Sequence, residues 1–116
     1  PPMTLHDTPD VIVALSTAPD EATARRIARQ LVEESLVACV NLLPGVASIY
    51  RWQGEVEDVA ECMMVIKTTR AAWPRLQQRL TELHPYEVPE LIAYDVREGH
   101  PPYLAWVAAN VKEGRP

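Results

Sequence analysis

LVACVNLLPGVASIYRWQGEVEDVAECMMVIKTT, residues 36–69, decides the fold because it holds two long apolar runs around one turn signal. The runs, 36–52 and 56–69, predict two antiparallel strands that form a hairpin turning near Gln53-Gly54. Pro44-Gly45 interrupts the first run and predicts a bend or bulge there. Strands this long exceed the usual length, so a small domain can hardly cover their outer ends, which predicts an oligomer.

A strand and a helix are expected before the hairpin. Residues 11–15 are almost wholly apolar and predict a buried strand, which ends before Pro19. Asp20 is a suitable N-cap for the helix that follows. The inward stripe of this helix would contain Ala24, Ile27, Ala28, Leu31 and Val32.

Two helices and a strand are expected after the hairpin. Pro74 is tolerated only in the first turn of a helix, so the second helix is predicted to start near residue 70 or 71. LIAYDV, residues 91–96, predicts a strand, and residues 101–111 predict a last helix with proline at its start. The inward positions of that helix would be Leu104, Val107, Ala108 and Val111.

This order of elements is typical of an α+β fold. Strand, helix, strand, strand, helix, strand matches the ferredoxin-like βαββαβ pattern with an antiparallel sheet, to which a C-terminal helix is added. Helices would then cover one sheet face and leave the other bare. An uncovered apolar face again predicts association with other subunits.

Length and charge limit the function. A chain of 116 residues suits a single domain spanning 1–116, in which residues 1–9 are expected to form a flexible N-terminal arm. The net charge of -5 lacks the basic excess that nucleic-acid binding requires. No apolar run approaches the roughly 20 residues of a membrane span, and no signal pattern begins the chain, so we expect a cytoplasmic protein without a membrane partner.

The two cysteines, Cys39 and Cys62, are expected to be free thiols. The hairpin register places position 62 opposite about position 45, some six residues or about 20 Å along the strand from Cys39. A disulfide needs about 7 Å or less between Cα atoms. Cys39 is therefore interpreted as a small residue on an apolar strand, in preference to a metal ligand.

The segment HPYEVPE, residues 84–90, follows the second predicted helix. Pro85 and Pro89 stiffen it, because each fixes its own backbone and pushes the preceding residue toward extended geometry. Tyr86 and Glu90 would then be held in fixed directions. His84 could bind a metal or could interact with the last carbonyls of the helix, and the second role is favoured.

Several segments resemble the CutA family of divalent-cation tolerance proteins. They are STAPDEATA, ACVNLLPGVASIYRWQGEVE, VIKTT, LHPYEVPEL and YLAW, in the same order and spacing over nearly the whole chain. The resemblance implies a ferredoxin-like subunit in a compact homotrimer, similar to the PII signalling proteins, with strands pairing between subunits. It also implies a link to copper and other divalent cations.

The metal ligands that the resemblance implies are only partly present. Family members proposed to bind copper have a cysteine where this chain has Ser16, and adjacent histidines where it has Leu83 and His84. Serine and leucine do not supply the thiolate or imidazole that copper prefers. Copper is therefore expected to bind weakly, through His84, with Cys39 as a further candidate ligand.

A second group of residues is expected to form a ligand cleft between the subunits of a family-like trimer. A lysine beside a carboxylate there could bind an anion or a carboxylate, or the group could be only an ion pair with aromatic packing. The residues are Tyr50, Trp52, Glu61, Lys67, Tyr86 and Glu90.

Four functions are compatible with these features. The leading hypothesis is a nonenzymatic homotrimer, implicated in divalent-cation or copper tolerance, that binds a metal or small ligand at intersubunit clefts. The alternatives are a PII-like trimer that senses small molecules without a metal role, and a structural scaffold trimer. An enzyme that uses His84 and Glu90 is chemically allowed, but no nucleophile, metal triad or phosphate loop supports it.

Overall fold

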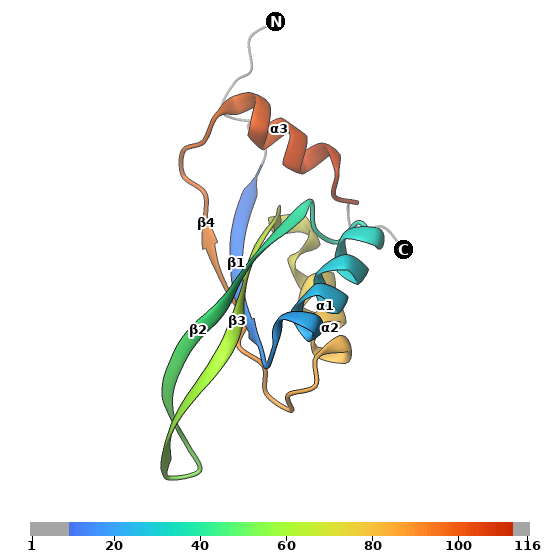
Figure 1. Cartoon of the computed structure of the whole chain (residues 1–116). Coiled ribbons are helices and arrows are strands. Elements are labelled where there is room, and N and C mark those ends of the chain that lie inside the picture. The colour runs from blue at the N-terminus through green and yellow to red at the C-terminus, as the bar shows by residue number, and fades with distance from the viewer. Residues whose placement is uncertain (1–9, 113–116) are drawn as a thin grey trace, which may run out of the picture.

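The computed structural model describes residues 10–112, so the predicted arm at residues 1–9 lies outside the described part. One antiparallel sheet has the strand order β2-β3-β1-β4, and helices pack on it (Figure 1). This confirms the predicted α+β, ferredoxin-like subunit with an additional C-terminal helix. The elements are β1 (Val11–Ala18), α1 (Glu21–Glu33), β2 (Cys39–Trp52), β3 (Glu55–Thr69), the short 3-10 helix η2 (Arg70–Ala72), α2 (Trp73–Leu83), β4 (Ile92–Asp95) and α3 (Pro101–Ala109).

Helices α1 and α2 cover one face of the sheet and enclose the main core with it (Figure 1). Asp20 caps α1 as predicted, because its side chain accepts a hydrogen bond from Thr23 N at 2.7 Å. Val32 was expected to face inward, but it is 41% exposed. At about 100° per residue it lies roughly 90° from the centre of the buried stripe, at its margin. The core side chains include Ala14, Ala24, Ile27, Leu31, Met64, Ile66, Leu76 and Leu80.

Helix α2 begins at Trp73, later than the predicted residue 70 or 71. The 3-10 turn of η2 occupies the intervening residues, and the Thr69 side chain accepts from Ala72 N at 3.3 Å. Pro74 still lies in the first turn of α2, as its missing N–H requires.

Helix α3 lies across one end of the sheet and forms a second, smaller core (Figure 1). Leu104, Val107 and Val111 are buried there as predicted, whereas Ala108 is only partly buried. None of the helices between residues 10 and 112 has the length and apolar character needed to span a bilayer.

The β2–β3 hairpin is much longer than its neighbours and projects away from the helices (Figure 1). It turns at Gln53 and Gly54, whose φ values are 51° and 84°. β1 pairs only with residues 62–69 of β3, so the distal part of the hairpin has no third strand within the described chain. Large apolar residues are exposed on it: Ile49, Tyr50, Trp52, Val56 and Val59.

The predicted irregularity at Pro44-Gly45 is a β-bulge. The register passes from Leu43 opposite Met63 to Val46 opposite Glu61, so β2 contains one extra residue, and Gly45 has a φ of 74°. Side chains alternate between faces along a strand, so the extra residue changes which ones share a face. Beyond the bulge, Ser48, Tyr50 and Trp52 lie on the same face as Glu61.

The cysteines behave as the register predicted. Cys62 lies opposite the bulge at Pro44-Gly45, Cys39 pairs with Lys67, and both cysteines are free thiols. Cys62 is buried, and this burial is the main cause that raises the pKa of its thiol.

The sheet face opposite α1 and α2 carries many apolar residues. Leu43, Ile92 and Tyr94 are 48%, 45% and 59% exposed on or beside it. They share this face with partly buried residues of β1 and β3, because the register pairs Val13 with Tyr94 and Leu15 with Ile92. Within residues 10–112 no helix covers these positions, in agreement with the expected bare face (Figure 1).

Candidate functional site

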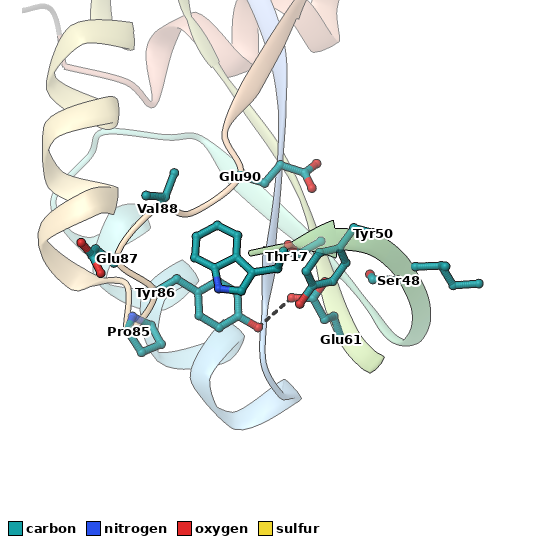
Figure 2. Close-up of a pocket in the computed structure, with 11 residues that line it drawn as sticks. Thr17, Ser48, Tyr50, Glu61, Pro85, Tyr86, Glu87, Val88 and Glu90 are labelled. Atoms are coloured by element: carbon teal, nitrogen blue, oxygen red, sulfur yellow. Dashed lines mark hydrogen bonds between the residues drawn. The ribbon is translucent and has the colours of Figure 1, made fainter. Parts of the chain in front are cut away.

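A pocket of about 690 Å³ lies where the distal hairpin meets the end of β1 and the connector between α2 and β4 (Figure 2). The bulge at Pro44-Gly45 puts Tyr50 and Trp52 on the hairpin face that lines it. The lining residues are Thr17, Ser48, Ile49, Tyr50, Trp52, Glu61, Pro85, Tyr86, Glu87, Val88 and Glu90.

The connector, residues 84–90, is fastened to β1 at both ends. The Nε2 of His84 lies 2.7 Å from Thr17 O, and its Nδ1 lies 3.1 Å from Tyr86 N. A carbonyl oxygen can only accept and a backbone N–H can only donate, so Nε2 is the donor to Thr17 O and Nδ1 is the acceptor from Tyr86 N. At the other end, Ser16 Oγ donates to Glu90 O at 2.6 Å. These bonds tie the connector to β1 next to Tyr86 and at Glu90.

Tyr86 and Glu61 form the polar centre of the pocket. The hydroxyl of Tyr86 donates to Oε2 of Glu61 at 2.7 Å (Figure 2). Glu61 is only 6% exposed, although it is a charged residue. Burial, followed by the hydrogen bond and the negative charge of Glu61, raises the pKa of Tyr86 above its ordinary value of 10.0. The phenol therefore stays protonated and keeps donating.

Aromatic rings and carboxylates dominate the remainder of the lining. Tyr50 and Trp52 are 42% and 48% exposed, so their faces are open to a ligand. The acidic lining residues are Glu61, Glu87 and Glu90, and no lysine or arginine of residues 10–112 lines the pocket. The site is thus acidic and aromatic.

Five of the six residues predicted for the ligand cleft line this pocket, and Lys67 does not. Lys67 lies opposite Val13, and its Nζ donates to Asn41 Oδ1. It shares a sheet face with Glu61, but six residues of extended strand separate the two by about 20 Å. The lysine and carboxylate expected to bind an anion together are therefore far apart.

The sequence did not indicate Thr17 or Ser48 as site residues, and it suggested Glu87 only as a possible copper ligand, yet all three line the pocket. Ser48 could have been found from the bulge, because alternation beyond it puts Ser48 with Tyr50. Glu87 lies inside the connector that was singled out. Thr17 is brought in by the fold, because its carbonyl receives the His84 hydrogen bond.

The residues at the family's copper-ligand positions do not fit a copper site. Both ring nitrogens of His84 already form hydrogen bonds. The buried Ser16 hydroxyl donates a hydrogen bond to Glu90 O, and Leu83 packs against the core. Cys39 pairs with Lys67 of β3, which in turn pairs with Val13 of β1, and Val13 lies four residues or about 13 Å along β1 from the Thr17 that His84 contacts. Across residues 10–112, no three histidine, cysteine, aspartate or glutamate side chains are grouped so as to hold a metal.

Cys39 contacts the C-terminal helix. Its Sγ lies 3.6 Å from the hydroxyl of Tyr103, and this hydrogen bond is the first cause that raises the pKa of Tyr103. Tyr103 in turn stacks on Trp106, with ring centroids 5.7 Å apart. This small cluster joins β2 to α3 and does not reach the pocket.

The four-stranded antiparallel sheet, the helices on one face and the long bulged hairpin define a ferredoxin-like α+β protein with a pocket at the base of its hairpin. The family model described as "CutA1 divalent ion tolerance protein" matches residues 12–110. The chain belongs to this family.

Individual relatives agree with this assignment. A divalent-cation tolerance protein CutA of Thermus thermophilus is 52% identical over 98 residues, which cover 84% of this chain and 95% of that protein. The solved structure of Cut A1 from Thermus thermophilus matches with a TM-score of 0.85 and 50% identity, covering 88% of this chain and 99% of that chain. CutA from Xylella fastidiosa matches with a TM-score of 0.86 and 45% identity, covering 89% and 99%.

Proposed function

We propose that this protein is a nonenzymatic cytoplasmic homotrimer of the divalent-cation tolerance class, which binds a small ligand or a metal in clefts between its subunits. The observation that carries the proposal is the apolar surface of the distal hairpin beside an acidic, aromatic pocket. Family membership supports the role in divalent-cation tolerance.

Association of subunits is supported by exposure on both faces of the hairpin. Tyr50 and Trp52 lie on one face, and Ile49 and Val56, which are 69% and 62% exposed, lie on the other. A single subunit cannot cover both faces, and exposed apolar patches of this kind mark interfaces. The sheet also ends in β2 and β4, whose outer edges pair with no other strand among residues 10–112. Pairing of these edges between copies would close a ring.

The ligand is proposed to bind in the pocket rather than at the copper-ligand positions. Ser16, Leu83 and His84 are committed to packing and hydrogen bonds, so copper binding there would be weak. The buried carboxylate of Glu61 favours a ligand-sensing trimer over a pure scaffold, because burying a charge that has only one neutral hydrogen-bond donor among residues 10–112 is unfavourable.

Light scattering after size exclusion tests the assembly. We expect three times the subunit mass for the natural protein, and a smaller mass for Val56→Asp, which puts a charge on the outer hairpin face. Gln77→Asp, on the exposed side of α2, is the matched control and is expected to keep the natural mass. A monomer at micromolar concentration would contradict the trimer.

Thermal unfolding in the presence of single metals and small metabolites tests ligand binding. A ligand that binds only the folded state raises the unfolding temperature, and the rise grows with the logarithm of the ratio of ligand concentration to dissociation constant. We expect at least one compound to do so in the natural protein and to lose its effect in Trp52→Ala. If neither metals nor metabolites of any charge change the unfolding temperature, the scaffold alternative replaces the ligand-binding proposal.

A further inference from the structure

We propose that the pocket formed by Tyr50, Trp52, Glu61, Tyr86 and Glu90 binds an organic cation, namely an ammonium ion carried on a small aliphatic group. This inference rests on the proposed ligand-binding function and names its ligand class. It follows from the charge of the lining, from one buried carboxylate and from three aromatic rings.

The negative charge of the lining is not balanced inside the described chain. Among residues 10–112, three glutamates line the pocket and no lysine or arginine does. The ion pairs that the structure contains between residues 10 and 112 all lie elsewhere, on α1, on α2 and at the start of β1. A cation entering this pocket would therefore meet carboxylates that have no other cationic partner in the described subunit.

The buried carboxylate of Glu61 is the feature of the pocket that most favours a cationic ligand. Glu61 is 6% exposed, and within residues 10–112 its side chain makes one hydrogen bond, which Oε2 accepts from Tyr86. One neutral donor does not balance a buried carboxylate, for which a paired cation is the usual solution. Because Glu61 also lines the pocket, a cation bound there would provide that pairing.

The aromatic residues select an organic cation over an inorganic one. The faces of tryptophan and tyrosine attract ammonium groups, and sets of such rings recognise alkylated ammonium ions. Tyr50 and Trp52 are about half exposed and belong to a hairpin face that the bulge directs to Glu61, while Tyr86 is held in place by the connector. Val88 and Pro85 add apolar surface for the carbon atoms of the ligand.

A divalent metal and an anion fit this pocket less well. Calcium needs six to eight oxygen ligands that converge on one point, and the acidic side chains of residues 10–112 form no group of three able to hold a metal. An anion would need a positive group, but Lys67 lies at the other end of the sheet face. The dispersed carboxylates suit a larger ion with diffuse charge.

Titration calorimetry with choline, a quaternary ammonium ion, tests the inference on the full-length protein. The control ligand is the neutral isostere of choline in which carbon replaces the nitrogen. We expect saturable choline binding that is at least about tenfold tighter than binding of the isostere, because the charge contributes both the ion pair and the cation–π contact. Equal affinity for the two compounds would overturn the inference.

Two variants locate the site. Glu61→Gln keeps an acceptor for Tyr86 but removes the charge, and it is expected to weaken choline binding about tenfold or more. Asp58→Asn makes the same change of charge on the opposite face of the hairpin and is expected to leave the affinity unchanged. If Glu61→Gln does not fold, as judged by circular dichroism, Trp52→Ala on the exposed hairpin decides. Unchanged choline binding by the decisive variant would overturn the inference.

The titrations also separate this inference from the proposed function. If choline fails to bind and acetate, citrate or a divalent metal binds in a manner that Trp52→Ala abolishes, the ligand-binding function stands and the cation inference is wrong. If choline and all of these compounds fail to bind, both are wrong.

Discussion

Removing the hydroxyl of Tyr86 tests whether the Tyr86–Glu61 pair stabilises the connector against the hairpin. Tyr86→Phe keeps the ring but leaves the 6% exposed carboxylate of Glu61 without its donor. Hydrogen bonds to charged groups contribute about 1.5–3 kcal/mol, so we expect the free energy of unfolding to fall by about this amount. The loss occurs without a change in packing, because phenylalanine fills the same volume apart from the oxygen.

The measurement is guanidinium chloride unfolding, followed by circular dichroism at one fixed protein concentration. The midpoint is expected to fall while the slope stays the same, since the surface exposed on unfolding is unchanged. Tyr94→Phe is the matched control, because Tyr94 is 59% exposed on β4 and its hydroxyl has no hydrogen-bond partner among residues 10–112. It is expected to change the free energy by less than about 0.5 kcal/mol.

A double-mutant cycle with Glu61→Gln isolates the charge. In the Glu61→Gln background the hydrogen bond is neutral, so Tyr86→Phe is expected to cost only about 0.5–1.5 kcal/mol. The reasoning is refuted if Tyr86→Phe is indistinguishable from Tyr94→Phe, or if the loss is equally large with glutamine at position 61.

Three further predictions follow from the site and the hairpin. The pKa of Tyr86 is raised, so the folded state keeps a proton that the unfolded chain releases above pH 10.0. The free energy of unfolding is therefore expected to fall as the pH rises beyond that value. Unfolding measured at several pH values is expected to show a smaller fall for Tyr86→Phe. Calorimetric titration of Cu²⁺ is expected to show weak binding to the natural protein. A Ser16→Cys, Leu83→His double variant places two donors beside His84 and is expected to bind Cu²⁺ about 10- to 100-fold more tightly per donor. Equal affinities of the two proteins would contradict the ligand assignment. Gly45→Ala is expected to lower the free energy of unfolding by about 1–2 kcal/mol, because no atom lies within 4 Å of the added Cβ and the cost arises only from a φ of 74°; an unchanged midpoint would show that the bulge relaxes.

The sequence predicted the architecture well because the fold depends on short-range patterns. Alternation along the hairpin, a stripe on each amphipathic helix and the Asp20 cap are all local signals, and they agree with one another. The free thiols followed from the register alone, since the turn at Gln53-Gly54 fixes which residues face each other. The errors lie at the margins of elements: Val32 and Ala108 are less buried than expected, and a turn of 3-10 helix precedes α2.

The candidate site was harder to predict because it depends on contacts between distant segments. Nothing local to the connector shows that both nitrogens of His84 are used, since one partner is the carbonyl of Thr17 in β1. Lys67 was expected beside Glu61 because both lie on the return strand of the hairpin, but six residues of that strand separate them. Lys67 was expected in the ligand cleft, and the pocket lining is acidic because Lys67 lies instead at the far end of the sheet face.

The bulge at Pro44-Gly45 makes the two faces of the distal hairpin depend on the exact number of residues between the bulge and the turn. Between the bulge and the turn, insertion or deletion of one residue would exchange the two faces of β2, so that Ile49 and Arg51 would replace Tyr50 and Trp52 beside Glu61. Insertion or deletion of two residues would keep the same side chains on each face and change only the length of the hairpin. Relatives whose hairpins differ in length are therefore expected to differ by an even number of residues in each strand, or to carry a second bulge that returns the side chains to their original faces.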